Sequence, residues 1–485
     1  MDFRMVFRRH LANLIGATMG LFLVACGGGG GDGAALATAD GATALTGSTA
    51  ASGSTGTAGS GSTTSATAGA AAAAETLTAA QYQAIRSSGQ GAAPEPAAQA
   101  LAALRTADQA LALAQWAAPV AGTARPSLFT GINEVVMPPL TYASARALRA
   151  AARGDSLAQM TEKLAGRIDL APDAAAAAWQ LSRVRSTAWS AVGFKMARDF
   201  LTTIDAGTAG WDLSETDFAG GGPFAAAQVA AMGSFAATND IRLLLSHELS
   251  LTARWPTATA FDGLFERGFH DLLAVRLVRL ADGVKRLNGS DFSADMLASG
   301  DLRVISLRPS SGDLTTFANH RLSAALTTAV QTLVIDGGGG AGEMLLPLGT
   351  VSLDLAVDAN LSDAGVTTVF DEVNANLKGL DLLGGTYAQV RSSLAQLEIA
   401  ADGLSLKAAH SLAFIFSPRN IHGPSNGVSL TISNGSFVFS CYVDPSYVWP
   451  AADLRSLFLI VVDSRGALLA LSTLNRPAGT AYSPC

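Results

Sequence analysis

Two short glycine motifs have the spacing of chemical sites. The first, Gly423–Gly427, matches G-x-S-x-G, the pattern in which a sharp turn from a strand into a helix exposes a nucleophilic serine, here Ser425. Pro424 precedes that serine, turn-forming residues surround it, and no helical pattern follows. Because the nucleophile needs a helix after it to hold the turn, the motif predicts an ordinary turn and not a hydrolase site.

The second motif, Gly337–Gly342, fits G-x-G-x-x-G and follows a strand-like segment, Val330–Ile335. Such a motif binds phosphate when it opens a helix, because the N–H groups of the helix N-terminus point at the ligand. The residues after Gly342 are not typical of a helix. We therefore expect a loop without a phosphate-binding role.

The composition argues against metal and nucleic-acid chemistry. The chain has only three cysteines and six histidines, which makes a structural zinc site improbable. Its formal net charge is −7, from 32 basic and 39 acidic residues that are interspersed, so no basic surface for nucleic acid is indicated. We expect no metal and no nucleic-acid partner.

The N-terminus has the pattern of an export signal. Arg4, Arg8 and Arg9 precede an apolar stretch, Leu11–Val24, that is too short and too poorly flanked to span a bilayer as a helix. We interpret residues 1–25 as a secretory signal peptide.

The end of this signal, Leu23-Val24-Ala25-Cys26, resembles the bacterial lipobox, in which the cysteine is acylated and becomes the first mature residue. Acyl chains hold a protein at a membrane by about 0.8 kcal/mol per buried CH₂, so two or more chains anchor it stably. The resemblance implies a bacterial envelope lipoprotein, periplasmic or cell-surface, anchored through Cys26. A cleaved signal with a chance cysteine is the alternative.

Two cysteines, Cys441 and Cys485, remain once Cys26 is assigned to the anchor. An even number in a compartment that permits oxidation predicts a disulfide. In the chain-entropy model such a bridge would stabilise the fold by about 4 kcal/mol. Two free thiols are the alternative, because the sequence gives no distance between them.

Residues 26–96 are rich in Gly, Ala, Ser and Thr and contain almost no large apolar side chain. Burial cannot offset the ordering entropy of such a stretch, so we expect a disordered tether with an end-to-end distance of about 40 to 50 Å. The folded domain would then span residues 97–485 and begin with an alanine- and leucine-rich helix over Ala97–Ala118.

The most distinctive run of the chain, Ile241–Trp255, reads I-R-L-L-L-S-H-E-L-S-L-T-A-R-W. It resembles, without a gap, the central strand of the serpins, roughly T-R-L-V-L-V-N-A-I-Y-F-K-G-K-W. Other segments that are similar to the family in order and spacing are Asn133–Pro138, Ala151–Ser156, Gly193–Lys195, Asp199–Leu201, Asp217–Phe218, Leu361–Phe370, Ala375–Leu380 and Leu457–Pro477.

The resemblance implies an α+β fold, with helices around a large mixed, mainly antiparallel central sheet, a barrel-like β portion and an exposed reactive loop. It implies a conformational trap and no catalytic activity. A serine protease cleaves the loop, stays acylated to its end, and is distorted when the freed segment enters the sheet. The expected partner is a serine protease, the expected state is a monomer, and no cofactor is needed.

The segment Leu394–Phe416 lies where serpins have their last sheet strand, hinge and reactive loop. The family pattern V-N-E-E-G-T-E-A-A-A-A-T assigns the hinge to Asp402, Gly403, Leu404, Ala408 and Ala409. Entry into a sheet requires alternation between a core face and a solvent face. The expected core face is Leu404, Leu406, Ala408, His410, Leu412 and Phe414. The expected solvent face is Ser405, Lys407, Ala409, Ser411 and Ala413.

Counting from Gly403 places the cleaved bond near Ser417. Cleavage between Phe416 and Ser417 would suit a chymotrypsin-like protease and keeps the proline at position 418 away from the cut. The second choice, between Arg419 and Asn420, would suit a trypsin-like protease.

Two residues are expected where the loop first enters the sheet. His247 stands where serpins usually carry an asparagine, and we expect it to make a hydrogen bond within the sheet. If the position keeps its family function, protonation near pH 6 would bias loop entry. Trp255 is expected to pack as a core aromatic at the upper end of the sheet.

A non-inhibitory surface protein with the serpin fold is the alternative function. In that case the alternation in Gly403–Phe416 marks a permanent strand, and bulky residues such as Leu404 are compatible with it because no fast entry is required. Residues 423–442, a surplus over the family pattern that alternates like a hairpin, would then be part of a recognition surface.

Overall fold

The computed structural model describes the chain from Glu75 onward, with gaps. The described residues are 75–86, 97–114, 133–164, 181–205, 211–220, 224, 226–232, 235, 240–255, 257–268, 271–311, 314–353, 355, 361–362, 364–392, 395–418 and 451–481. They all belong to one compact unit of the chain. None of the helices that they form is long and apolar enough to cross a membrane.

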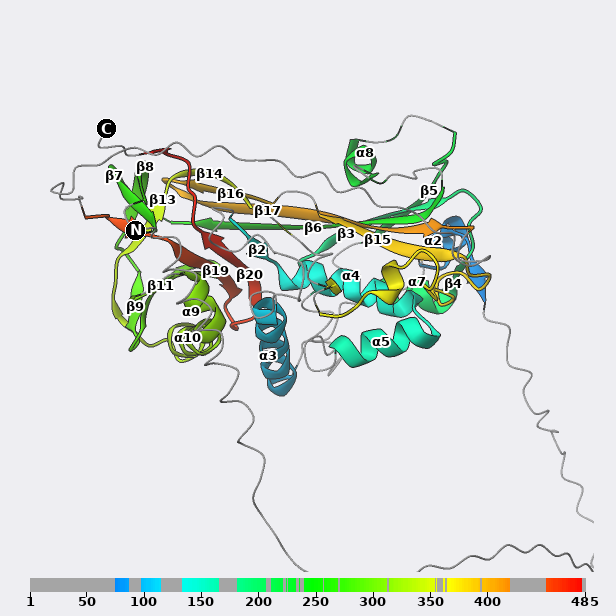
Figure 1. The fold of residues 1–485 in the computed structure, drawn as a ribbon, viewed down its shortest axis with the longest axis horizontal. Helices are drawn as coiled ribbons and strands as arrows, with labels where there is room; N and C mark the ends of the chain where they lie inside the picture. Colours follow the sequence, from blue (N-terminus) through cyan, green and yellow to red (C-terminus); the bar gives the residue numbers. More distant parts are fainter. Residues whose placement is uncertain are drawn as a thin grey trace, which may run out of the picture. The chain divides into compact units, whose positions relative to one another are not determined.

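A seven-stranded sheet, which we name the central sheet, carries the candidate site (Figure 1). Its strands lie in the order β14-β16-β17-β6-β3-β5, and β15 pairs with β17 next to β16. All paired neighbours are antiparallel except β3 and β5. The strands are Gly349–Leu353 (β14), Ala395–Ala400 (β16), Gly403–Phe416 (β17), Ile241–Arg254 (β6), Arg185–Ala191 (β3), Trp211–Thr216 (β5) and Thr386–Ser392 (β15).

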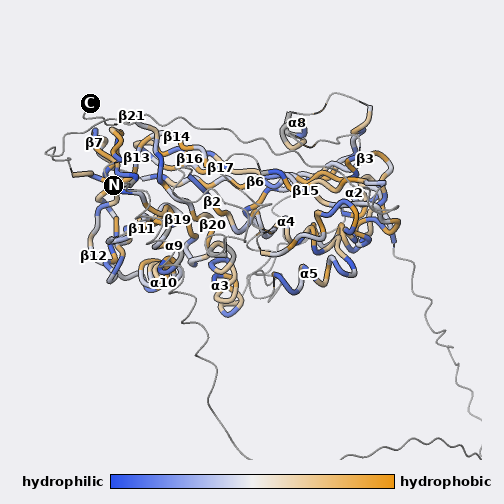
Figure 2. Tube along the Cα trace, in the orientation of Figure 1, coloured by the Kyte–Doolittle hydropathy of each residue, from blue (hydrophilic) through white to orange (hydrophobic). Residues whose placement is uncertain are grey.

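The burial of β6 follows from what covers each face of the sheet. From Leu249 to Arg254, buried and exposed residues alternate, as expected for a strand with one face in the core. Before Leu249 nearly every residue is buried, because α4 (Pro138–Ala151) packs on one face and α8 (Ala226–Met232) on the other (Figure 1). Hydrophobic and hydrophilic residues are both found along the central strands (Figure 2).

Helix α4 can lie close to the sheet because its buried residues are mostly small. Pro138 and Pro139 begin the helix, where a missing N–H leaves no bond unmade. Its small buried residues are Thr141, Ala143, Ser144, Ala145, Ala147 and Ala151. The helix contacts β6, β17 and β20, and α5 (Gly154–Leu164) and α7 (Arg198–Asp205) lie on the same side of the sheet (Figure 1).

Two further sheets form the barrel-like portion. A second seven-stranded sheet has the order β12-β9-β10-β11-β19-β20-β2, and a five-stranded sheet has the order β13-β8-β7-β18, with β21 added to β8. Their strands are Gly340–Ala341 (β12), Lys285–Asn288 (β9), Phe292–Ser299 (β10), Leu302–Pro309 (β11), Leu457–Asp463 (β19), Leu468–Leu474 (β20), Val135–Val136 (β2), Met344–Pro347 (β13), Asp271–Leu280 (β8), Thr259–Gly268 (β7), Leu454–Arg455 (β18) and Thr480–Ala481 (β21). The expected α+β architecture is therefore confirmed.

Helices cover the outer side of the second sheet. An apolar cluster joins residues of β11, β19 and β20 to α9 (Leu314–His320) and α10 (Leu322–Ala329). Every residue of β19 and β20 is buried. The hairpin that they form is therefore a rigid part of this portion of the fold.

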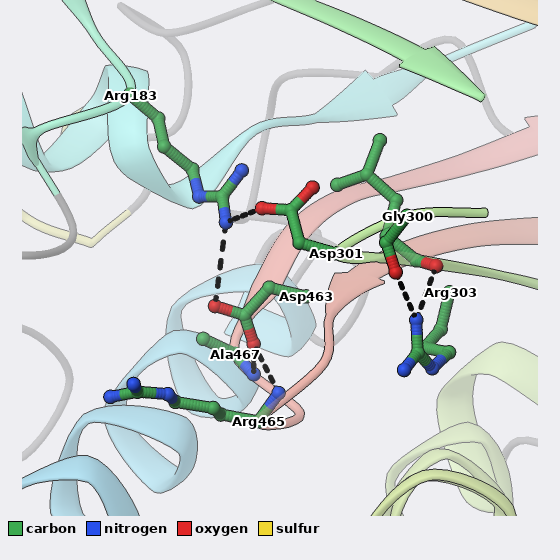
Figure 3. A network of polar contacts seen from close by, with 8 residues as sticks. Arg183, Gly300, Asp301, Arg303, Asp463, Arg465 and Ala467 are labelled. Atoms are coloured by element: carbon green, nitrogen blue, oxygen red, sulfur yellow. Dashed lines mark hydrogen bonds and ion pairs between the residues drawn. The ribbon is translucent and has the colours of Figure 1, made fainter. Parts of the chain in front are cut away.

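A network of polar contacts joins the start of the central sheet to this second sheet (Figure 3). The guanidinium of Arg183, just before β3, pairs with Asp301 and lies 3.9 Å from the carboxylate of Asp463. Asp463 is buried and also accepts the backbone N–H groups of Arg465 and Ala467, which closes the turn between β19 and β20. Burial raises the pKa of the Asp463 carboxyl above its ordinary value.

The folded part begins earlier than the predicted boundary at residue 96. Within the predicted tether, β1 (Thr76–Leu77) pairs with β4 (Met196–Ala197), and α2 (Ala79–Arg86) packs beside β5. Tyr82 of α2 is buried and donates its hydroxyl hydrogen to Asp205 at 3.0 Å. The composition of the tether as a whole concealed this helix, because a single buried aromatic residue supplies most of its apolar surface.

The glycine motif at Gly337–Gly342 has no helix after it, as predicted, but the segment before it is not a strand. Val330–Ile335 forms η3, a π-helical turn that continues α10. Val330 and Leu333 are buried, and their spacing of three suits one face of a helix over the apolar cluster. The helix predicted over Ala97–Ala118 is α3, Ala98–Ala114, among the described residues.

A buried carboxylate in the second sheet gives a test of this fold. Asp295 of β10 accepts hydrogen bonds of 2.6 and 2.8 Å from Arg286 and also pairs with Arg308. The Asp295 side chain is fully buried. We expect Asp295→Ala to lower the free energy of unfolding by about 3 kcal/mol, because two arginines lose a buried partner. Urea denaturation measures this loss.

The matched control is Asp262→Ala. Asp262 pairs with Arg276 at 3.0 Å, and both side chains are more than half exposed. An exposed pair of this kind contributes at most about 1 kcal/mol. Equal losses in the two variants would contradict the role given to Asp295.

Candidate functional site: the inserted strand β17

The candidate site is strand β17, which lies between β6 on one side and β15 with β16 on the other. Its pairing with β6 runs from Gly403 opposite Arg254 to Ile415 opposite Ile241. On the other side, β16 pairs with the first part of β17 and β15 with the last part. The segment expected as an exposed reactive loop is therefore a central strand in this arrangement. It pairs with N–H and C=O groups of β6, β15 and β16 that would otherwise form open strand edges.

The predicted alternation of faces holds in the first half of β17. Leu404, Leu406 and Ala408 are buried, and Lys407 is exposed. In the second half, Ser411 and Ala413 are buried although both were expected to face solvent. The cause is α8, which contacts β17 on the face opposite α4.

At the N-terminal end of β17, the turn between β16 and β17 is hydrogen bonded to the end of β6. The indole Nε1–H of Trp255 donates to the carbonyl oxygen of Ala401 at 2.8 Å. The backbone N–H of Trp255 donates to the carbonyl oxygen of Asp402 at 3.2 Å. Asp402 also pairs with Arg254 at 2.6 Å, with both side chains exposed. Trp255 is buried, and its two hydrogen bonds hold the turn at which β17 begins.

Gly403 fits because it has no side chain. A Cβ atom at this position would lie 2.5 Å from the carbonyl oxygen of Ala253 on β6. Real Cβ contacts are essentially never closer than 3.0 Å, so any larger residue would push the strands apart. The hinge glycine predicted from the sequence therefore has a steric role in the inserted arrangement.

A buried polar cluster lies at the middle of β17. His410 faces His247 of β6 in register, and their ring centroids are 5.1 Å apart. The hydroxyl of Ser144 on α4 is hydrogen bonded to Nε2 of His410. The hydroxyl of Ser186 on β3 is hydrogen bonded to Nδ1 of His247, at 2.8 Å. The hydrogen bond expected for His247 within the sheet is therefore present.

Burial in this cluster disfavours the charged form of both histidines. It lowers the pKa of His247 from the ordinary 6.5 to about 4. For His410, burial and then the neighbouring His247 lower the pKa well below its ordinary value. Both imidazoles are therefore neutral near pH 7.

At its C-terminal end, β17 finishes at Phe416, which is half-buried. The guanidinium of Arg242 lies 5.0 Å from the centroid of the Phe416 ring. Ser417 is buried. Its backbone N–H donates to Gly385, and its hydroxyl donates to the carboxylate of Glu372 at 2.8 Å. The predicted cleaved pair thus lies at the end of the inserted strand and is not presented to a protease in this arrangement.

The remaining predicted site residues lie outside the described part of the chain. They are Cys26, Arg419, Asn420, Cys441, Cys485 and the segment 423–442. Their assignments stay predictions.

Sequence reasoning did not identify the serines of the polar cluster. Neither Ser144 nor Ser186 belongs to a segment that the sequence analysis assigned. The alternation did place His410 on the core face. Its opposition to His247 depends on the register between two strands that are distant in the sequence, and no local pattern carries that information.

No protein-family model matches the sequence, and no curated protein is significantly similar to it in sequence. Solved structures are similar in fold. A cleaved serpin, serpin 42Da, is 13% identical and has a TM-score of 0.57, with 79% of this chain and 100% of that chain covered. A loop-inserted, P1-P1′ cleaved ovalbumin mutant is 12% identical with a TM-score of 0.55, over 77% of this chain and all of that one.

A third similar structure is a thermophilic serpin, tengpin, in the latent state. It is 12% identical, with a TM-score of 0.54 over 79% of this chain and 100% of that chain. Together with the central sheet and the barrel-like portion, these structures show that the chain has the serpin fold. In the described residues it is the form of that fold in which β17 occupies the centre of the sheet.

The contact at Gly403 gives a test of the inserted arrangement. We expect Gly403→Ala to destabilise it by about 1 to 3 kcal/mol, because the new methyl group overlaps the backbone of β6. Thermal unfolding of the purified protein measures the change. Gly340→Ala is the matched control, because a Cβ at Gly340 would have no atom within 4 Å. Equal melting temperatures of the two variants would contradict the steric role of Gly403.

Proposed function

We propose that the protein inhibits a serine protease by cleavage and insertion of its reactive loop. The observation that supports this most directly is the position of Gly403–Phe416, which fits the centre of the sheet as a paired strand with apolar side chains in the core. This is the position that a freed loop must take to trap a protease. The activity is stoichiometric trapping, and no catalytic turnover is proposed.

Insertion would move the end of the loop a long way. Strand β17 has 14 residues. At about 3.3 Å per residue, its two ends are about 45 Å apart. A protease acylated to Phe416 would therefore be carried along most of the central sheet, and its active site would be pulled by a strand paired on both sides.

The driving force of insertion is the burial that β17 gains in the sheet. Phe414 is fully buried and packs edge-to-face on Phe200 of α7, with ring centroids 5.9 Å apart. Leu404, Leu406 and Leu412 are also buried. Complete burial of such side chains stabilises by about 1.5 to 3 kcal/mol each. Cleavage would therefore yield a product more stable than the form with the loop in solvent.

The two candidate bonds predict different proteases. Cleavage between Phe416 and Ser417 fits a chymotrypsin-like enzyme, and cleavage between Arg419 and Asn420 fits a trypsin-like enzyme. The first choice places the acylated residue directly at the end of β17.

The second candidate function is a non-inhibitory binding protein in which β17 is a permanent strand. The observation that favours it is the size of Leu404 and Leu406, which would enter first and are almost fully buried in the core. Large residues at these positions slow entry, and a slow loop is cleaved without trapping the enzyme.

We propose in addition that the protein is a bacterial envelope lipoprotein held at the membrane through Cys26. The basic residues before the apolar stretch and the lipobox-like sequence support this location. The partner protease would then be met at the periplasmic side or at the cell surface, and the protein would act as a monomer.

Incubation with chymotrypsin and with trypsin tests the inhibitory function. We expect the form with the loop in solvent to give a covalent complex on a denaturing gel and a cleaved product with a higher melting temperature. Cleavage without a complex but with a higher melting temperature would mean that insertion is too slow to trap. Cleavage without either change would favour the binding protein.

Two variants sharpen that test. In Ala408→Arg a charge faces the core, at a position that is 6% exposed, so we expect cleavage without a complex and without a gain in melting temperature. Ser405→Arg places the same side chain on the opposite face, where the register partner Thr252 is exposed, and should trap like the unmodified chain. A complex formed equally by both variants would contradict trapping by insertion.

The anchor has its own test. We expect Cys26→Ser to move the protein from the membrane fraction to the soluble fraction of its bacterial host, because the thiol that carries the lipid is absent. Fractionation and immunodetection measure the distribution. Unchanged membrane association of the variant would contradict anchoring through Cys26.

A further inference from the structure

The central sheet contains a pair of histidines that exists as a pair only when β17 is in place. His410 belongs to β17, and His247 belongs to β6. The two are opposed in register, with ring centroids 5.1 Å apart. Their exposed fractions are 0% and 1%, so both imidazoles lie in the interior between the sheet and α4.

This environment suits two neutral imidazoles and not a charged one. Each histidine has one ring nitrogen bonded to a serine hydroxyl, Ser144 for His410 and Ser186 for His247. The second nitrogen of each, Nδ1 of His410 and Nε2 of His247, has no hydrogen-bond partner among the described residues. A protonated imidazole would carry an N–H at both nitrogens, so its new donor and its charge would be buried without compensation.

The charged groups on the surrounding strands lie on the opposite face of the sheet. Neighbouring residues of a strand point to opposite faces, and cross-strand partners share one. The side chains concerned are exposed and belong to Arg185 of β3, Glu248 of β6, Arg391 of β15 and Lys407 of β17. None of them can therefore compensate a charge in the histidine pair.

The titratable groups of α4 near the pair are Tyr142 and Arg146. Each is two residues from Ser144, which places it about 200° around the helix from the serine that contacts His410. Consistent with this, the lowered pKa of His247 comes from burial, and that of His410 from burial and His247. No carboxylate contributes to either shift.

We propose that the His247–His410 pair makes the stability of the inserted β17 dependent on pH, so that the inserted strand is more stable at neutral pH than at mildly acidic pH. This inference rests on the proposed function, because it requires a form of the chain in which β17 lies outside the sheet. It adds a regulator of that movement, in which a proton is the ligand of the withdrawn form.

The direction of this pH dependence follows from the two environments of His410. In water a histidine has a pKa of about 6.5, and in the inserted strand the pKa of His410 is far lower. The inserted form therefore has its full stability above pH 6.5 and loses it as the pH falls below that value. A histidine that stays neutral in the sheet at pH 5.0 and has a pKa of about 6.5 outside it favours the form with β17 outside the sheet about 30-fold more at pH 5.0 than at pH 7.5.

Hydrogen exchange of the full chain, read by mass spectrometry at pH 7.5 and 5.0 and corrected for intrinsic rates, tests the proposal. We expect the protection of peptides from β17 to fall about 30-fold or more at pH 5.0, while the rigid hairpin β19–β20 keeps its protection. In His410→Gln, which is neutral at both pH values and can still bond to Ser144, the fall should be smaller, because only His247 is left to titrate. His320→Gln, at an exposed histidine at the end of α9, is the matched control and should behave like the unmodified chain.

A second variant, His247→Gln, keeps the test decisive if His410→Gln does not fold, and its fall in protection should be smaller than that of the unmodified chain. Equal protection of β17 at both pH values in the unmodified chain would overturn the proposal, and so would an undiminished fall in the histidine variants. Formation of the protease complex at pH 7.5 is scored separately. A complex with no pH effect on β17 would remove this inference and leave the proposed function standing.

Discussion

The structure depends on one pairing, that of β17 between β6 and the two strands β15 and β16. This pairing satisfies the backbone of long strands on both sides and places the apolar face of β17 against α4. Removing β17 would leave two open edges in the middle of the central sheet, each with unpaired N–H and C=O groups. In the proposed function, this segment lies outside the gap before cleavage and fills it afterwards, and this movement takes the place of a catalytic site.

Strand β17 can occupy this place in the sheet because the neighbouring backbones can approach one another closely. Gly403 allows β17 to begin beside β6 without displacing Ala253. The small buried residues of α4 allow that helix to lie directly under the strands. The same closeness brings Ser144 within reach of His410, so a packing requirement and a polar contact arise from one helix.

The polar groups in the centre of the sheet cost stability and add specificity. A buried imidazole with one unbonded nitrogen is less favourable than an apolar side chain of the same size. In exchange, the two hydroxyl–imidazole bonds are formed only in the observed register of β17, β6 and β3. Elsewhere, the contacts of Arg183 with Asp301 and Asp463 tie the two sheets together at the start of β3.

The sequence by itself determined the features that depend on local spacing. These include the run at Ile241–Trp255, the glycine at the start of β17, and the core-facing side of the first half of β17, because the two-residue period of a strand is present in consecutive residues. Only the tertiary structure decided that β17 is inserted, that α8 buries Ser411 on the second face, and that His410 meets His247. Each of these depends on which distant segment lies alongside, and the free energy of that choice comes from contacts between segments that no local pattern records.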